Sequence, residues 1–425
     1  MKPYQKVFVC ALAVTLLLTA CESRTLAPAP EEPVIGESVV EETPQLPEEP
    51  QEPTIPEGAP GFYETCQEMN GWEVFSLSTA QDLVELSSWL QEGQNSAHCI
   101  FQLQADIDLS GIEFIPIGTK ENPFQGTFLG QGYSISGLSV TSPNYGEAAG
   151  LFGYLNGALV DSLHVSGTVT ACQVAGGLAG SASDSTIQEC SFTGSVYGMA
   201  NDIGGLCGSA HHTEFYDCSA DADVTGQESL GGFAGVLGDG CLVKNCSALG
   251  QVSAANREYW LSEYGLPEPD WGTQPDGEIM VRYIGGFVGM NIGSIQNCLS
   301  MGAVKALETA KTIGGFVGYE SGSDAGCYYF LDYNAQWQPG YAVGDNASLS
   351  AQGLYYDRMA TRTSFEGWDF DTTWQMGQRH PELMAQSPLT AQMVAGVPDP
   401  TAGLEGESTT PDENESTKSE NTEVG

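Results

Sequence analysis

Five cysteines return at one position of a repeated pattern, which is compatible with a metal site, a set of disulfides or a buried column. They are Cys190, Cys218, Cys246, Cys298 and Cys327. Zinc sites need cysteines in close pairs that converge on one ion, whereas these cysteines occur once per repeat. Leu163 occupies the same position in the first repeat, and leucine can replace a core residue but not a ligand. The sequence therefore predicts a buried column of thiols and no metal site.

A disulfide is expected at a different pair of cysteines. Parallel neighbours in a stack have unsuitable Cβ directions for a bridge, which argues against disulfides within the repeats. Cys66 and Cys99 lie outside the repeats, on either side of a segment with a helical pattern. Because an exported chain meets an oxidising environment, we expect a Cys66–Cys99 disulfide that ties the first strand across this helix.

The other residue types with catalytic potential do not form a known motif. The five histidines lack the HExxH spacing of zinc peptidases, and no Gly-rich phosphate-binding motif is present. An alternative is a β-helix polysaccharide lyase or glycosidase, which needs two positioned carboxylates. Candidate carboxylates are Asp202, Asp221, Asp223 and Asp239. Because basic residues are scarce around them, we expect no enzymatic activity, no catalytic residues and no cofactor.

The charge balance excludes one class of partner. The formal net charge of the 425-residue chain is -42, with only 13 lysines and arginines. Such a surface repels the phosphates of nucleic acids. We therefore expect no nucleic-acid partner.

Glycine-containing pentapeptides define the repeat. They begin at residues 149, 176, 204, 231, 285 and 314, so successive starts differ by 27, 28, 27, 54 and 29 residues. The apolar runs between them are short, rich in β-branched and aromatic residues and without a helical period. A period near 28 predicts an all-β fold, a parallel and right-handed β-solenoid of about six coils.

The residue before each repeat cysteine also fits a solenoid. These residues are Glu189, Asp217, Asn245, Asn297 and Gly326. Aspartate, asparagine and glycine tolerate the left-handed backbone that a sharp corner requires. Glu189 departs from this pattern, as does Ser162 in the first repeat.

Caps are expected at both ends of the coils, which span residues 149–330. We expect residues 61–148 to form an N-terminal cap with an amphipathic helix at 78–92. We expect residues 331–397 to form a C-terminal cap. Residues 398–425 are polar and acidic, which predicts a disordered tail.

The doubled interval contains an insertion, residues 254–283. Long insertions in repeat proteins often project from one face and bind ligands. Large aromatic residues among polar ones suit recognition of a sugar or a protein. The candidates are Tyr259, Trp260, Tyr264 and Trp271. The alternative is that these side chains pack back onto the coil.

The N-terminus resembles the leader of a bacterial lipoprotein. Residues 1–20 carry two lysines and a short apolar run that ends in Leu18-Thr19-Ala20-Cys21. This tetrapeptide resembles the lipobox, in which the cysteine is acylated and becomes the first residue of the mature chain. The resemblance implies lipidation at Cys21 and a lipid anchor in the membrane. Residues 21–60, rich in proline and glutamate, predict an extended stalk.

The repeats resemble the GLUG repeats of bacterial surface proteins, which also occur in non-catalytic parts of IgA-cleaving metallopeptidases. The resemblance rests on the pentapeptides and cysteines, with "FQLQADIDLSGIEFIPIGT" before them and "FEGWDFDTTWQM" after them. It implies a β-solenoid on the cell surface and does not specify a ligand. We therefore expect a lipid-anchored protein on the extracytoplasmic face of a bacterial membrane that binds an extracellular glycan or protein without catalysis.

Overall fold

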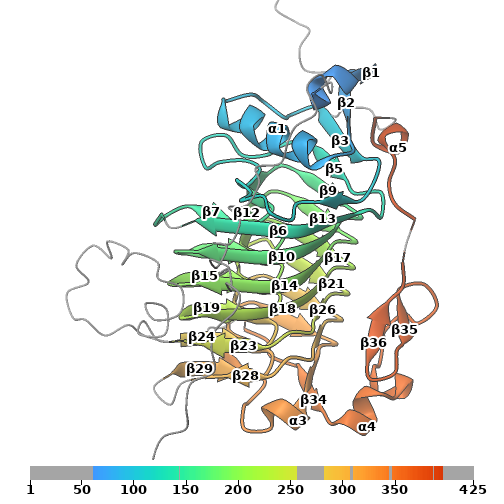
Figure 1. Cartoon of the computed structure of the whole chain (residues 1–425). Coiled ribbons are helices and arrows are strands. Elements are labelled where there is room, and N and C mark those ends of the chain that lie inside the picture. The colour runs from blue at the N-terminus through green and yellow to red at the C-terminus, as the bar shows by residue number, and fades with distance from the viewer. Residues whose placement is uncertain are drawn as a thin grey trace, which may run out of the picture. The chain divides into compact units, whose positions relative to one another are not determined.

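In a computed structural model, the chain forms a parallel β-solenoid whose strands stack in four sheets (Figure 1). The structure describes residues 61–142, 144–255, 282–306, 310–343, 347–385 and 387–395. All of them belong to one compact unit, Pro50–Gly425. The first two strands pair antiparallel, and the neighbours that follow along each sheet pair parallel. Residues one repeat apart therefore lie side by side in neighbouring coils.

Two of the sheets are the longest. Sheet A consists of β1 (Gln67–Met69), β2 (Trp72–Leu77), β3 (Cys99–Leu103), β5 (Thr127–Leu129), β9 (Leu159–Asp161), β13 (Thr186–Gln188), β17 (Glu214–Tyr216), β21 (Leu242–Lys244), β26 (Ser294–Gln296) and β31 (Ser323–Ala325). Sheet B consists of β4 (Ile107–Asp108), β6 (Ser134–Ser142), β10 (His164–Ala171), β14 (Ser191–Gly198), β18 (Ser219–Gly226), β22 (Ser247–Ala248), β23 (Val252–Ala254), β27 (Leu299–Ser300), β28 (Val304–Lys305), β32 (Tyr328–Phe330) and β34 (Gln352–Leu354).

Two shorter sheets complete the coils. Sheet C consists of β8 (Phe152–Asn156), β12 (Ala179–Ser183), β16 (Cys207–His211), β20 (Ala234–Leu237), β25 (Val288–Asn291), β30 (Val317–Glu320) and β33 (Tyr341–Ala342). Sheet D consists of β7 (Ala148–Ala149), β11 (Val174–Gly176), β15 (Asn201–Gly204), β19 (Glu228–Gly231), β24 (Arg282–Gly285) and β29 (Lys311–Gly314).

A hairpin and a few helices lie outside these sheets. The antiparallel hairpin is formed by β35 (Trp374–Met376) and β36 (Pro381–Leu383). The α-helices are α1 (Ala80–Gln91), α3 (Leu331–Asn334), α4 (Tyr356–Met359) and α5 (Ala391–Ala395), with 3₁₀ turns at Phe62–Thr65 and Arg362–Ser364. In the described part of the chain, no helix combines the length and the hydropathy of a membrane span.

Sheet A gives the number of coils, because each coil contributes one strand to it. Of its ten strands, all but the antiparallel β1 follow in parallel order from β2 to β31. The solenoid thus has about 9 turns, and the predicted number of about six was too low. The coils that the repeat count missed run through β2, β3 and β5, where no glycine pair marks the repeat. They still bury inward-facing side chains such as Phe101 and Phe128, so they extend the same core.

The interior is built from columns of equivalent residues, one from each coil. The five repeat cysteines are almost completely buried, as is Leu163 at the equivalent position. Each thiol donates to the carbonyl oxygen two residues earlier, over 3.1 to 3.4 Å. The third pentapeptide residue forms a second column, in which the rings of Phe233, Phe287 and Phe316 stack with centroids 4.9 and 5.0 Å apart. The predicted buried column of thiols is confirmed.

The glycine pairs allow neighbouring backbones to approach closely. A Cβ atom on Gly204 would collide with the carbonyl oxygen of Cys207 in its own coil. The same atom would lie 2.6 Å from Cα of Ala234 in the next coil. Only a residue without a side chain fits there, so this glycine is required by packing and not by a left-handed backbone.

In six coils, the corner between sheets A and B places one residue in the left-handed conformation. The φ angle lies between 50° and 63° at Ser162, Glu189, Asp217, Asn245, Asn297 and Gly326. Glu189 and Ser162 adopt it although their residue types disfavour it, because stacking on neighbouring coils imposes the same corner. Burial raises the pKa of the Glu189 carboxyl group, and the nearby charge of Asp161 raises it further.

Replacing Glu189 by asparagine is expected to raise the free energy of unfolding by about 1 kcal/mol at neutral pH. Asparagine tolerates a positive φ better than glutamate does, and the change removes a carboxylate that burial disfavours. Chemical denaturation of the two proteins measures the difference. Asn245→Glu is the reverse control and should destabilise by more than this amount, because it also removes the hydrogen bond from Asn245 Nδ2 to Asp217. Equal stability of all three proteins would contradict the argument from backbone strain.

Helix α1 covers the N-terminal end of the coils, as predicted for residues 78–92. Thr79 is its N-cap: the hydroxyl accepts from the backbone N–H of Asp82, and the Asp82 carboxylate accepts from the backbone N–H of Thr79. The helix ends before Gly93, whose φ is 87°. Its apolar face is buried on the first coils through Leu83, Leu86 and Leu90.

The chain after the last coil covers a side of the solenoid as well as its end. Residues 331–343, which include α3, lie over the end, where Trp337 Nε1 donates to the carbonyl oxygen of Val304 at 3.1 Å. Residues 354–383 pack instead on the outer face of sheet B. The apolar cluster that joins this segment to sheet B consists of Leu299, Tyr328, Phe330, Met359, Phe365, Trp368 and Trp374.

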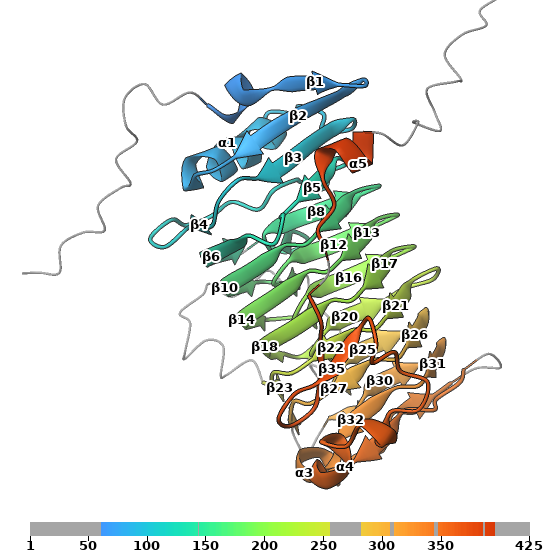
Figure 2. The same cartoon turned by 90° about the vertical axis from the view of Figure 1, so that its right-hand side faces the viewer.

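A strap, residues 387–395, returns from this side to the first coils (Figure 1, Figure 2). The backbone N–H of Leu389 donates to the Asp161 carboxylate at 3.0 Å, and Asn70 Nδ2 donates to the carbonyl oxygen of Ala395 at 3.4 Å. Helix α5 covers outward-facing apolar side chains of β2, β3 and β5, namely Val74, Ile100 and Leu129. The strap thus joins the last described segment to the first coils.

Candidate functional site

Two of the predicted sites lie outside the described residues. Cys21 belongs to residues 1–60, and the aromatic candidates Tyr259, Trp260, Tyr264 and Trp271 belong to residues 256–281 of the insertion. Lipidation at Cys21 and ligand binding by the insertion therefore stay predictions. The described residues offer a candidate site elsewhere.

The predicted Cys66–Cys99 disulfide is not formed, since both residues are free thiols. Strand β2 separates them, because β1 pairs with one edge of β2 and β3 pairs with the other. Two strand spacings, about 9.6 Å, exceed the Cα separation that a disulfide allows. The Cys99 thiol instead donates to Glu73 Oε2 at 3.7 Å. Burial and the Glu73 carboxylate raise the pKa of Cys99 to about 12.

The repeat cysteines have no metal-binding arrangement. Among the described residues, no group of three or more His, Cys, Asp or Glu side chains is placed to hold an ion. The thiols follow one another along the interior, and burial raises the pKa of Cys190 and Cys246, which keeps these two thiols protonated. Their role in the structure is packing.

The carboxylates of the lyase or glycosidase alternative are not brought together. Asp221 and Asp223 are exposed on β18 of sheet B, whereas Asp202 lies on β15 of sheet D. Asp239 follows β20 of sheet C. The four candidates therefore do not form one site: Asp202 and Asp239 lie apart from the others, and only Asp221 and Asp223 share a strand, where the Asp223 carboxylate accepts from the backbone N–H of Gln251 at 3.0 Å.

A cavity of about 370 Å³ near the strap contains two other carboxylates, Glu189 and Asp217. Both are already hydrogen-bonded within the corner column: Ser162 Oγ donates to Glu189 at 3.2 Å, and Asn245 Nδ2 donates to Asp217 at 3.0 Å. Burial raises the pKa of both carboxyl groups. None of the described residues that line this cavity is a lysine or an arginine, and its histidine, His164, has Nδ1 within 2.8 Å of Ser191 Oγ.

Another cavity, of about 420 Å³, combines aromatic and basic side chains. Its walls come from the ends of β22 and β27, from the segment around α3 and α4, and from the turn of the β35–β36 hairpin. The volume falls in the range of small-molecule pockets, about 300–1,000 Å³. We call it the hairpin pocket; the side chains that matter for binding are Phe330, Tyr333, Tyr356, Arg379 and His380.

Two tyrosines of the hairpin pocket are exposed and yet fixed in position. Tyr333 is 59% exposed and Tyr356 is 52% exposed. The ring of Tyr333 meets that of Phe330 edge to face, with centroids 5.0 Å apart. The backbone N–H of Tyr356 donates to the Asp332 carboxylate at 2.9 Å, which joins α4 to α3. Exposed aromatic faces on a fixed backbone suit the recognition of a sugar or a protein.

The hairpin turn presents Arg379 and His380. The backbone N–H of Gly377 donates to the carbonyl oxygen of His380 at 2.9 Å and closes the turn. At the base of the hairpin, the Trp374 side chain is fully buried against Trp368, with ring centroids 4.3 Å apart. The turn is therefore held on the solenoid by a buried anchor.

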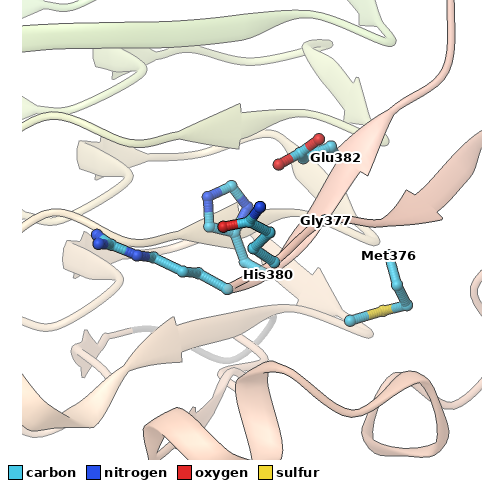
Figure 3. Close-up of a pocket in the computed structure, with 6 residues that line it drawn as sticks. Met376, Gly377, His380 and Glu382 are labelled. Atoms are coloured by element: carbon cyan, nitrogen blue, oxygen red, sulfur yellow. The ribbon is translucent and has the colours of Figure 1, made fainter.

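The histidine of the turn has a defined tautomer. His380 Nδ1 lies 2.8 Å from the Pro381 carbonyl oxygen, which can only accept, so Nδ1 carries the proton. Nε2 of the neutral ring is then an acceptor. Figure 3 shows His380 with Met376 and Glu382 at the turn, where these residues and Arg379 also line a second, open cavity of about 650 Å³.

The structure describes four arginines, and Arg379 is the one whose side chain has no side-chain partner among the described residues. Arg282 and Arg362 form ion pairs with carboxylates at 2.7 and 3.6 Å, and Arg358 donates to a serine hydroxyl at 3.2 Å. Arg379 thus keeps its donors available at the surface of a chain whose net charge is -42.

A family model of the GLUG motif matches residues 171–197 and 226–253. Each matched segment runs through the corner residue and cysteine of one coil. The chain carries GLUG repeats. No curated protein sequence matches the chain.

The GLUG-repeat solenoid also resembles a solved structure. A crystal structure from Bacteroides ovatus, provisionally assigned as an immunoglobulin A1 protease, matches with a TM-score of 0.56 and 19% sequence identity. The match covers 75% of this chain and 95% of that one. At this identity the likeness shows a shared fold and nothing about activity.

The residues of the hairpin pocket were missed by the sequence analysis. Arg379 and His380 are adjacent basic residues in an acidic chain, and this is the one local signal that could have marked them. Tyr333 and Tyr356 carry no such signal, because only the folded C-terminal segment brings them to the same cavity.

Proposed function

We propose that this protein is a lipid-anchored solenoid on a bacterial cell surface that binds an extracellular glycan or protein and does no catalysis. The observation that supports binding is the hairpin pocket, where two exposed tyrosines lie beside a histidine and an arginine. This arginine has no side-chain partner among the residues that the structure describes. The stacked coils provide the rigid support that a binding site needs. The lyase or glycosidase alternative has less support, because Asp202 and Asp239 lie apart from Asp221 and Asp223, the two candidates that share a strand.

Glycan and protein arrays probed with the full chain in detergent test the binding role. We expect specific binding to at least one ligand. Tyr356→Ala tests the hairpin pocket and Trp260→Ala/Trp271→Ala tests the insertion, and the variant that touches the site should weaken binding at least tenfold. If the full chain binds nothing above background on either array, the proposed binding role is refuted.

The lipid anchor is proposed from the lipobox-like sequence that ends at Cys21. Cys21→Ala is expected to abolish incorporation of labelled palmitate and to release the protein from the membrane fraction, because the lipobox position then has no thiol to carry the acyl chains. Cys10→Ala, within the apolar run, is the control and should leave labelling unchanged. Normal labelling of the Cys21→Ala variant would exclude this anchor.

A further inference from the structure

We propose that the hairpin pocket binds a carboxylated sugar, meaning a pyranose ring that bears a carboxylate. The tyrosines would contact the ring and Arg379 would pair with the carboxylate. This inference rests on the proposed binding function and adds the chemical class of the ligand.

The dimensions of the hairpin pocket favour a small ring over a protein surface. The cavity measures about 420 Å³ and is concave, with walls from three parts of the fold. A stable protein partner needs about 800 Å² of contact on each side, whereas small ligands bind in concave pockets of this size. A single sugar residue at the end or side of a glycan fits this description.

The basic group of the pocket selects a carboxylate. The planar guanidinium group of arginine presents paired N–H donors that match the two oxygens of a carboxylate. In the described part of the chain the other three arginines are committed to carboxylate or hydroxyl partners, and Arg379 is not. A neutral sugar offers no such charge-assisted pairing to the exposed guanidinium group, so we expect it to bind more weakly.

The aromatic and polar groups complete a site for a ring with hydroxyl groups. The C–H face of a pyranose is apolar and packs on exposed aromatic rings such as Tyr333 and Tyr356, which are 59% and 52% exposed. Because Nδ1 of His380 donates to Pro381, Nε2 of the neutral ring can accept from a sugar hydroxyl. The pocket is held by the Asp332–Tyr356 hydrogen bond and the buried Trp374, so little ordering is needed on binding.

The charge of the whole chain makes the pairing with Arg379 decisive. A net charge of -42 repels anions at long range. An anionic sugar therefore gains its affinity from short-range contacts alone. Loss of the guanidinium group should then remove the preference for the acidic ligand.

Methyl β-D-glucuronide and methyl β-D-glucoside form a matched pair of probes, because they differ only in a carboxylate against a hydroxymethyl group. The methyl glycosides of galacturonic acid and galactose form a second such pair. The methyl glycoside of a sialic acid is a further acidic probe. Titration calorimetry or ligand-observed NMR with the full chain in detergent measures each affinity. We expect at least one acidic probe to bind tenfold or more tightly than its neutral counterpart.

Two pairs of variants locate this preference. Arg379→Gln should abolish the preference for the acidic probe, while Arg358→Gln removes a charge from the same segment outside the pocket and should keep it. Tyr356→Ala should weaken binding at least tenfold. Tyr355→Ala is its control, because Tyr355 is equally exposed at 52% and does not line the pocket.

The proposal is overturned if acidic and neutral probes bind equally, or if Arg358→Gln has the same effect as Arg379→Gln. It is also overturned if no sugar binds while a protein on the array does, and in that case the proposed binding function stands. If neither sugars nor proteins bind, both proposals are refuted.

Discussion

Replacing Phe287 by alanine is expected to lower the free energy of unfolding by about 3–5 kcal/mol, through lost burial and the cavity left behind. Its ring is fully buried between those of Phe233 and Phe316, with centroids 4.9 and 5.0 Å away and planes within 10° of parallel. Chemical denaturation followed by circular dichroism measures the loss. Since a coil contacts mainly its neighbours, hydrogen exchange should increase most in β20, β25 and β30.

Phe287→Leu is the matched control for this prediction. Leu178 and Leu206 fill the equivalent position in earlier coils and are fully buried there. The column therefore accommodates leucine, and we expect a cost of about 1–1.5 kcal/mol. If the alanine and leucine variants were equally stable, the ring stack would not contribute to the core in the way that its geometry indicates.

Replacing Glu320 by glutamine is expected to stabilise the protein strongly at pH 9 and to change its stability little near pH 5. Glu320 has no exposed surface, and Asn291 Nδ2 donates to its carboxyl group at 2.9 Å. The pKa of Glu320 is raised to about 8, mainly by burial and in addition by the charge of the nearby Asp324.

The direction of the pH effect follows from where the proton is held. In the unfolded chain the Glu320 carboxyl group loses its proton near the ordinary pKa of 4.5, whereas the folded protein keeps it up to about pH 8. Between these values the folded state binds more protons, so the free energy of unfolding falls as the pH rises and levels off above pH 8. A shift of this size corresponds to roughly 3–5 kcal/mol. Glutamine does not ionise, so the free energy of unfolding of the variant does not fall in this way as the pH rises.

Denaturation curves between pH 5 and pH 9 measure the difference between the Glu320→Gln variant and the original protein. The difference should grow from near zero at pH 5 to about 3 kcal/mol or more at pH 9. Glu214→Gln, at an exposed position on β17, is the control for loss of one negative charge. If the two variants behave alike across this range, the burial of Glu320 does not control its ionisation.

Repetition made most of the solenoid predictable. One coil in a sequence gives a weak pattern, but equivalent positions in several coils show which substitutions the core accepts. Leu163 in line with the repeat cysteines indicated burial, and the Asp, Asn and Gly residues before them indicated the left-handed corner. Glu189 adopts that corner too, because stacking on neighbouring coils outweighs the preference of a single residue.

The features that were missed depend on contacts between distant parts of the chain. Coils without a glycine pair escaped the count, and the strand that separates Cys66 from Cys99 could not be placed without its pairing partners. The strap is short and has no clear period, and its contact surface on β2, β3 and β5 comes from the other end of the solenoid. The hairpin pocket likewise joins residues from separate elements.

The strap has a consequence for the order of events during biosynthesis. The hydrogen bond between Asn70 and Ala395 spans 325 positions in the sequence, and the ribosome makes the first coils long before the strap. Val74, Ile100 and Leu129 stay uncovered until α5 has been synthesised and has docked. A prematurely terminated chain that lacks α5 therefore leaves this apolar patch on β2, β3 and β5 exposed, whereas the full-length chain covers it. Chaperones and quality-control proteases, which bind exposed apolar segments, can tell the two products apart on that basis.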